Sequence, residues 1–175
     1  MSLVLVERAF ESPQIFAELQ AREDAVGWCL EQYDVAFRRT YFGVDGLRAV
    51  CLFNAPDAES VRATQRRAGV PMQRAYPIEV SGSAEPLLTE QDGHPLIVEL
   101  DHDEPVTVAG LDALWAARAA RLASQGARLH GCYLARGGRR SVALLTAAST
   151  EGSGTLAHEV DLPGARVWPA ILHLP

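Results

Sequence analysis

A repeat constrains this chain more than any other feature of its sequence: shifted by 92 positions, the sequence aligns with itself without a gap. The matched positions include apolar, charged, glycine and proline residues. They include Val6/Val98, Glu7/Glu99, Pro13/Pro105, Tyr41/Tyr133, Gly46/Gly138, Arg48/Arg140, Pro71/Pro163 and Arg74/Arg166. One offset that is kept across both turn residues and core residues indicates a tandem duplication.

The duplication predicts two units, residues 1–80 and 95–175, joined by a linker at residues 81–94 that is rich in glycine, serine and proline. A domain of this size buries only roughly 60% of its surface when it folds alone. Because 48% of the residues are apolar, we expect the units to bury a face against each other in one pseudo-symmetric body. Any ligand pocket is then expected between them.

Apolar periodicity and turn residues predict the order β-α-β-β-α-β in the first unit. Strands are expected at residues 3–9, 35–42, 47–53 and 72–80, and helices at residues 12–30 and 57–68. Ser12 and Asp57 are the predicted helix N-caps, and Asp45-Gly46 predicts a hairpin turn. This order is that of the ferredoxin-like unit, an α+β fold with both helices on one face of the sheet.

The second unit repeats the order at residues 96–100, 105–125, 128–135, 139–146 and 165–174, with a weak helix before the last strand. Glycines stand at positions 152 and 154, where the first unit has Ser60 and Arg62. Each glycine costs a helix about 1 kcal/mol relative to alanine. This helix is therefore expected to be short or irregular.

Composition excludes several classes of function. The net charge of −6 argues against nucleic-acid binding. All sixteen basic residues are arginines, so Schiff-base chemistry and a lysine-bearing phosphate loop are excluded. Three widely spaced cysteines, Cys29, Cys51 and Cys132, suit buried thiols in a reducing compartment. No membrane-spanning or signal segment is evident, so a cytoplasmic protein without membrane contact is expected.

The first unit also resembles a known family. The stretch A-P-D-A-E-S-V-R at residues 55–62, together with L-V-E-R at 5–8 and A-G-V-P at 68–71, is similar to a bacterial family of short proteins of unassigned function. Some members are described as dimeric nickel-binding proteins with a ferredoxin-like fold. The resemblance covers residues 3–80, and the second unit is then a diverged copy. It implies a dimeric α+β barrel whose two sheets come from one chain. The cofactor is unknown from the residues, and a divalent metal such as nickel is suggested by the resemblance alone.

The residues themselves offer little to a metal. Nickel prefers imidazole and carboxylate ligands, yet all five histidines follow residue 93. No metal site is expected in the first unit, and His102 and His130 are the weak candidates in the second. The run Asp101 to Glu104 is expected to be a solvated acidic loop, because only alternate side chains of an extended segment converge.

Glu7 and Glu99 interrupt aliphatic strands at the same point of each repeat. Facing a shared pocket, they would form a paired-carboxylate site suited to proton transfer or cation binding. The alternative is a pair of strand-end ion pairs with Arg48 and Arg140.

Other repeated positions complete a candidate ligand site with unequal walls. Arg74 and Arg166 are suited to an anionic ligand, and His130 replaces Arg38. The candidate ligand-binding residues are Glu7, Arg38, Tyr41 and Arg74 in the first unit and Glu99, His130, Tyr133 and Arg166 in the second.

These features predict a small-molecule or metal-ion binding module, with catalytic residues unknown. Two other classes stay open: a cofactor-independent enzyme of the monooxygenase or isomerase type, and a structural or regulatory protein without a pocket. A homodimer of the two-unit chain is a further expectation for its partners.

Overall fold

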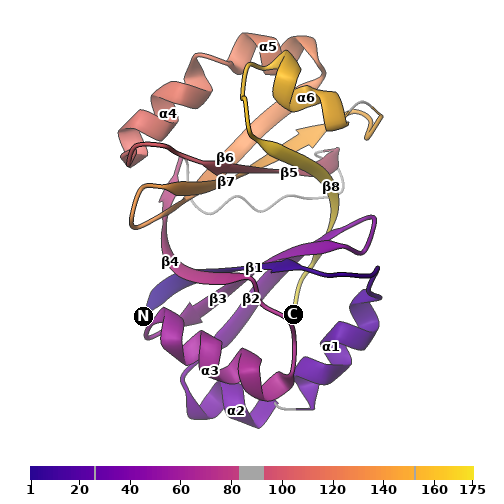
Figure 1. The fold of residues 1–175 in the computed structure, drawn as a ribbon, viewed down its shortest axis with the longest axis vertical. Helices are drawn as coiled ribbons and strands as arrows, with labels where there is room; N and C mark the ends of the chain where they lie inside the picture. Colours follow the sequence, from indigo (N-terminus) through magenta and orange to yellow (C-terminus); the bar gives the residue numbers. More distant parts are fainter. Residues whose placement is uncertain (26, 83–92, 152) are drawn as a thin grey trace. The chain divides into compact units, whose positions relative to one another are not determined.

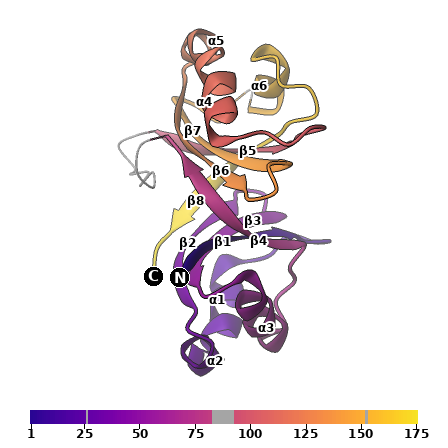
Figure 2. The same cartoon turned by 90° about the vertical axis from the view of Figure 1, so that its left-hand side faces the viewer.

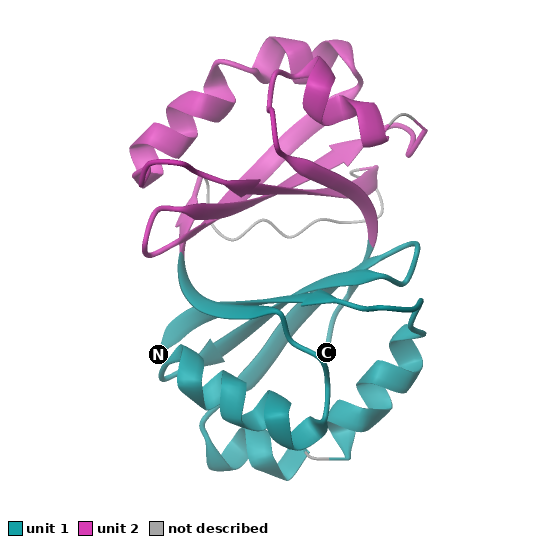
Figure 3. Ribbon diagram, viewed as in Figure 1, with its two compact units in different colours: residues 1–78, 171–175 teal, residues 79–170 magenta. Residues whose placement is uncertain are grey.

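The computed structural model describes residues 1–25, 27–82, 93–151 and 153–175. They form two compact units, one of residues 1–78 and 171–175 and the other of residues 79–170 (Figure 3). Most of the linker predicted at 81–94 lies outside the described residues. No helix in the described parts of the chain is long and apolar enough to cross a membrane.

The two halves of the chain contain the same types of element in the same order (Figures 1 and 2). The first half comprises β1 (Ser2–Ala9), α1 (Phe16–Asp24), α2 (Gly27–Gln32), β2 (Ala36–Gly43), β3 (Arg48–Ala55), α3 (Ala58–Ala68) and β4 (Arg74–Ser81). The second comprises β5 (His94–Asp101), α4 (Val108–Ala116), α5 (Ala119–Ser124), β6 (Ala127–Ala135), β7 (Arg140–Ala147), α6 (Ser153–Glu159) and β8 (Arg166–His173).

Each half builds one antiparallel sheet, ordered β4-β1-β3-β2 in the first and β8-β5-β7-β6 in the second. Equivalent pairs keep equivalent registers: Glu7 lies opposite Arg74 and Val50, and Glu99 lies opposite Arg166 and Val142. The predicted fold class, tandem ferredoxin-like units of the dimeric α+β barrel class, is confirmed.

The register breaks at the same place in both sheets. In β2 it shifts between Phe37 and Arg39, and in β6 between Leu129 and Gly131. Arg38 and His130 are therefore equivalent bulge residues, and a bulge is a place where a strand redirects a side chain.

The first helix of each half differs from prediction. Helix α1 begins at Phe16 rather than at Ser12, and Ile15 occupies its N-cap without a side-chain hydrogen bond. The backbone before α1 makes a different contact, because the Gln14 backbone N–H donates to the Gly46 carbonyl at 2.8 Å. The predicted long helix is also divided into α1 and α2, just as α4 and α5 divide its counterpart.

The second helices follow the sequence more closely. Asp57 caps α3 by accepting from the Ser60 amide at 2.8 Å, and Gly69 ends the helix in the left-handed conformation. Helix α6 has 7 residues where α3 has 11. The expectation of a short helix in the glycine-containing segment is thus confirmed.

A hydrophobic core lies between the helices and one face of each sheet. In the first unit Val4 and Val6 of β1 pack with Leu19 of α1 and Val61 of α3. In the second the equivalent cluster includes Leu96, Val98, Leu111 and Leu156. The three cysteines are free and buried, and burial raises the pKa of the Cys51 and Cys132 thiols.

The first core contains a buried arginine that sequence reasoning missed. Arg8 donates to the Glu23 carboxylate at 2.6 Å, to the Gln65 amide oxygen at 2.5 Å and to the Pro71 carbonyl at 2.9 Å. Its Nε also donates to Cys51 Sγ at 3.3 Å. The Arg8 side chain is 0% exposed, so the network joins α1, α3 and the segment before β4 to strand β1.

The second core replaces this network with apolar side chains. At the positions equivalent to Arg8 and Glu23 it has Leu100 and Trp115, both buried within the cluster. Burial raises the pKa of Glu23, and the Arg8 guanidinium opposes that shift. The two repeats therefore fill one volume with different chemistry.

Candidate functional site

The candidate residues gather on the face of each sheet that points away from the helices of the same unit, which we call the distal face. Strand side chains alternate between faces. Because Val6 lies in the helix-covered core of the first unit, its neighbour Glu7 lies on the distal face. By the same alternation Val98 places Glu99 on the distal face of the second unit. Both glutamates are buried, at 2% and 6% exposure.

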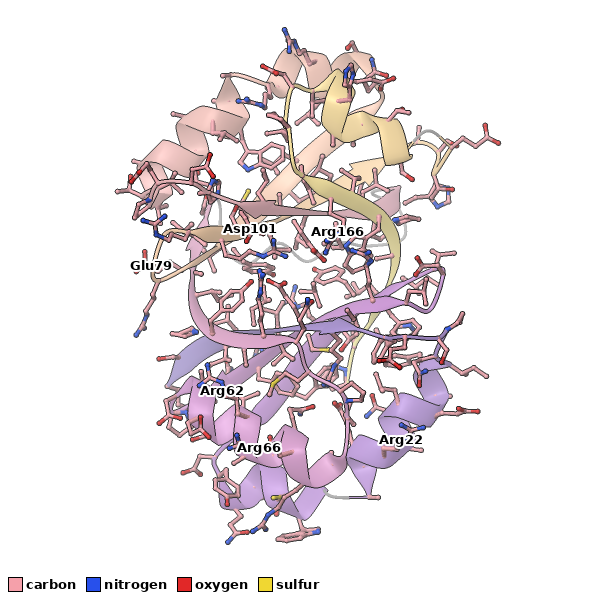
Figure 4. All side chains as sticks on the ribbon, in the orientation of Figure 1. Arg22, Arg62, Arg66, Glu79, Asp101 and Arg166 are labelled. Carbon is pink, nitrogen blue, oxygen red and sulfur yellow. The ribbon has the colours of Figure 1, made fainter. Side chains whose placement is uncertain are left out.

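Glu99 is the centre of a hydrogen-bonded cluster on the second distal face. Its Oε2 accepts from Arg140 Nη2 at 2.9 Å and from Arg166 Nη1 at 3.1 Å, and its Oε1 accepts from Trp168 Nε1 at 2.9 Å. Arg140 also contacts Asp101, with Nη1 3.1 Å from Oδ2. Figure 4 labels Asp101 and Arg166, the two outer members of this chain of charges. The cluster contains two carboxylates and two guanidinium groups.

The ion pair between Glu99 and Arg140 is the one expected as the alternative to a pocket role. It arises because Arg140 lies two residues before Val142, the residue opposite Glu99, and so reaches Glu99 diagonally across the sheet. The sequence had named Arg166 as a ligand-binding candidate, and here it is also held by Glu99.

The first distal face has the equivalent strand pairing and an equivalent buried glutamate, but different charged residues around it. The Tyr76 hydroxyl donates to the Glu7 carboxylate, as the Trp168 indole does to Glu99. Arg74 lies opposite Glu7, and Arg48 begins β3 opposite Ala9. Arg39, which is 4% exposed, also lies on this face because it is opposite Leu52.

The first unit thus carries more positive charge than its copy. The counterpart of Arg39 is Gly131 and that of Ala9 is Asp101, while the counterpart of Ala36 is Arg128, an exchange in the opposite direction. Arg38, in the bulge, is exposed. Among the strand residues described on the first distal face, three arginines accompany one carboxylate. The sequence could have indicated Arg39, because an arginine in place of a repeat glycine is a large change.

Tyr41, Tyr133 and His130 belong to strands, whereas His102 directly follows β5. Tyr41 and Tyr133 are 0% exposed and lie opposite Val50 and Val142 on the distal faces. His130 Nε2 is 2.7 Å from Thr146 Oγ1. His102 Nε2 is 2.8 Å from Ser141 Oγ, and burial lowers the His102 pKa.

A nickel ion does not fit the residues present. Across the described ranges, no group of three or more histidine, cysteine, aspartate or glutamate side chains is placed to hold a metal. His102 and His130 each contact a different hydroxyl of β7. The strands around Glu7 carry arginines, and a guanidinium group is a positively charged hydrogen-bond donor that cannot ligate a cation.

Residues 5–78 match the family model of the nickel-responsive SCO4226-like proteins. The first repeat is similar to this SCO4226-like family. The resemblance predicted from the A-P-D-A-E-S-V-R stretch is therefore confirmed over these residues, while the chain as a whole extends well beyond the SCO4226-like match. No curated protein matches the chain significantly.

Solved structures resemble the fold at low sequence identity. A protein provisionally named chlorite dismutase TA0507 has a TM-score of 0.50 at 9% identity, with 97% of this chain and 93% of that one covered. An anthrone oxidase-like protein has a TM-score of 0.47 at 11% identity, with 99% and 93% covered. A provisionally named monooxygenase from Lactobacillus acidophilus NCFM has a TM-score of 0.45 at 7% identity, with 98% and 94% covered. The first of these likenesses supports the fold alone.

Proposed function

We propose that this protein is a small-molecule binding module that takes an anionic ligand on the distal face of its first unit. The two distal faces differ in charge, and this difference supports the proposal. Arg39, Arg48 and Arg74 share the described first face with one carboxylate, that of Glu7. On the second face two carboxylates, those of Glu99 and Asp101, accompany three arginines, Arg140, Arg166 and the exposed Arg128 opposite Thr146.

Arginine suits this role because its planar fork of donors matches carboxylates and phosphates. Arg39 lies buried on the same face, opposite Leu52. Arg38 and Arg74 are exposed and Arg48 is half-buried, so an incoming anion has access from the solvent side. Glu7 lies on β1, between the strands that carry Arg48 and Arg74, and a hydrogen bond from the Tyr76 hydroxyl holds its carboxylate in place.

A metal ion is the less suitable ligand for this face. Its arginines would repel a cation, and nickel needs imidazole, thiolate or carboxylate donors in one cluster. The family name of the first repeat is therefore not carried over as a ligand assignment.

A thermal-shift titration of the full chain with citrate, succinate and inorganic phosphate tests the proposal. A ligand at a hundred times its Kd stabilises the folded state by about 2.7 kcal/mol, which corresponds to a rise in Tm of roughly 5–10 °C for a chain of this size. Added sodium chloride should reduce the shift, because salt screens exposed charges.

Matched variants identify the face. Arg74→Gln should reduce the anion-induced shift, whereas Arg22→Gln, which removes the same charge from the exposed surface of α1 (Figure 4), should leave it unchanged. Equal effects of the two substitutions, or no shift with any of the three anions, would show that the first distal face is not an anion site.

A further inference from the structure

The second unit contains a carboxylate of its own at the place where the first unit has none. Asp101 lies directly opposite Arg140 in the β5–β7 register, and Ala9 lies directly opposite Arg48 in the β1–β3 register. The two pairs are equivalent under the repeat. A carboxylate side chain therefore stands against the arginine in one copy, and a methyl group stands there in the other.

The geometry at Arg140 shows how this position handles a carboxylate. Arg140 Nη1 is 3.1 Å from Asp101 Oδ2, and Arg140 Nη2 is 2.9 Å from Glu99 Oε2. One guanidinium group is thus shared between a buried carboxylate and an outer one: the Glu99 side chain is 7% exposed and that of Asp101 is 68% exposed. Such fork-shaped contacts are well suited to planar carboxylates.

The first unit has the same residue types at the two inner positions. Glu7 occupies the place of Glu99, and Arg48 the place of Arg140. The outer carboxylate is missing because residue 9 is alanine, and Ala9 is exposed to solvent. A small molecule can reach Arg48 there without displacing a side chain at position 9.

We propose that the anionic ligand is a small carboxylic acid, and that one of its carboxylates binds Arg48 beside Ala9, where the carboxylate of Asp101 binds Arg140 in the second unit. This assignment rests on the proposed function of the first distal face. Arg48 and Arg74 lie on the strands at either side of β1, opposite Ala9 and Glu7, so two interstrand spacings and a two-residue step along β1 put their backbones roughly 12 Å apart. A short di- or tricarboxylate spans the space between the ends of two arginine side chains, so a second ligand carboxylate is assigned to Arg74.

Two substitutions of Ala9, one charged and one neutral, test the assignment. Ala9→Asp gives the first unit the built-in carboxylate and should weaken succinate binding at least tenfold in isothermal titration calorimetry. Ala9→Asn has nearly the same shape without the charge and should retain most of the affinity. Both variants alter an exposed residue at a strand end, and circular dichroism checks that they fold.

The opposite change is Asp101→Ala, which removes the built-in carboxylate from the second unit. Arg140 then lies opposite an alanine, as Arg48 does in the first unit, and succinate should bind at a second site, raising the stoichiometry from one to two per chain. Combining Asp101→Ala with Ala9→Asp should move the single site from the first unit to the second.

The possible outcomes separate this inference from the proposed function. If Ala9→Asp and Ala9→Asn bind succinate alike while Arg74→Gln still weakens binding, the carboxylate position is wrong but the anion-binding face stands. If phosphate binds as tightly as succinate, and its affinity is the same for Ala9→Asp as for the unmodified chain, the carboxylic-acid assignment is overturned. If the unmodified chain binds neither probe, both proposals are refuted.

Discussion

The buried network around Arg8 predicts a large and specific loss of stability when its carboxylate is removed. In Glu23→Leu the Arg8 guanidinium stays in place with 0% side-chain exposure, and Gln65, Pro71 and Cys51 offer it only neutral partners. Arginine does not deprotonate in proteins. The core would then contain an uncompensated positive charge.

Breaking a buried ion pair by removing one partner costs about 3–5 kcal/mol. A typical free energy of unfolding is about 5–15 kcal/mol, so this loss is a large part of the total. It corresponds to a fall in Tm of roughly 6–20 °C for a chain of this length. Urea unfolding near neutral pH, followed by far-UV circular dichroism, measures the loss directly.

The second repeat supplies the compensating change. Because Leu100 and Trp115 fill the equivalent positions there, the double variant Arg8→Leu with Glu23→Leu should recover most of the stability lost in Glu23→Leu. A control, Glu18→Leu, removes an exposed acid from the same helix and should change stability by about 0.5 kcal/mol or less. A cost below about 1 kcal/mol for Glu23→Leu, or a double variant no more stable than the single one, would refute the reasoning.

Two further predictions concern other parts of the fold. Gly138 has a φ of 70° and a Cβ there would lie 2.5 Å from the Val106 carbonyl oxygen, so Gly138→Ala should cost at least about 1 kcal/mol in urea unfolding. Gly137→Ala, which meets no atom within 4 Å, is the control, and equal losses would contradict the steric explanation. Burial lowers the pKa of His173, which stacks on Phe16 with ring centroids 3.5 Å apart. The corresponding stability is fully present above the unfolded pKa near 6.5 and is lost as pH falls toward the folded pKa. His173→Phe should therefore lose less stability than the unmodified chain between about pH 7.5 and about pH 5.5, and an unchanged loss would contradict this origin.

Much of the fold could be predicted because its sequence signals are local or recur at the constant offset of 92 residues. Asp45-Gly46 indicated the hairpin, and Asp57 and Gly69 indicated the ends of α3. Because of the repeat, the same elements could be predicted 92 residues later in the second half. The start of α1 could not be predicted in this way, because the Gln14 backbone amide donates to the Gly46 carbonyl, a contact between the segment before α1 and the turn of the β2–β3 hairpin.

The candidate site divides along the same line. Alternation and the 92-residue offset were enough to place Glu7 and Glu99 at equivalent strand positions, since side-chain direction in a strand follows from sequence parity. Their partners were decided by strands far away in sequence: Trp168 reaches Glu99 across 69 residues.

The sequence by itself determined the duplication, the order of elements and the absence of lysine chemistry, because these depend on residue type and on short-range periodicity. Only the tertiary structure decided that Arg8 lies inside one core while its repeat partner is Leu100, and that Asp101 neutralises Arg140 while Ala9 leaves Arg48 a different neighbour. Charges interact through space, and the distance between two charged groups is set by strand pairing and packing rather than by their separation along the chain.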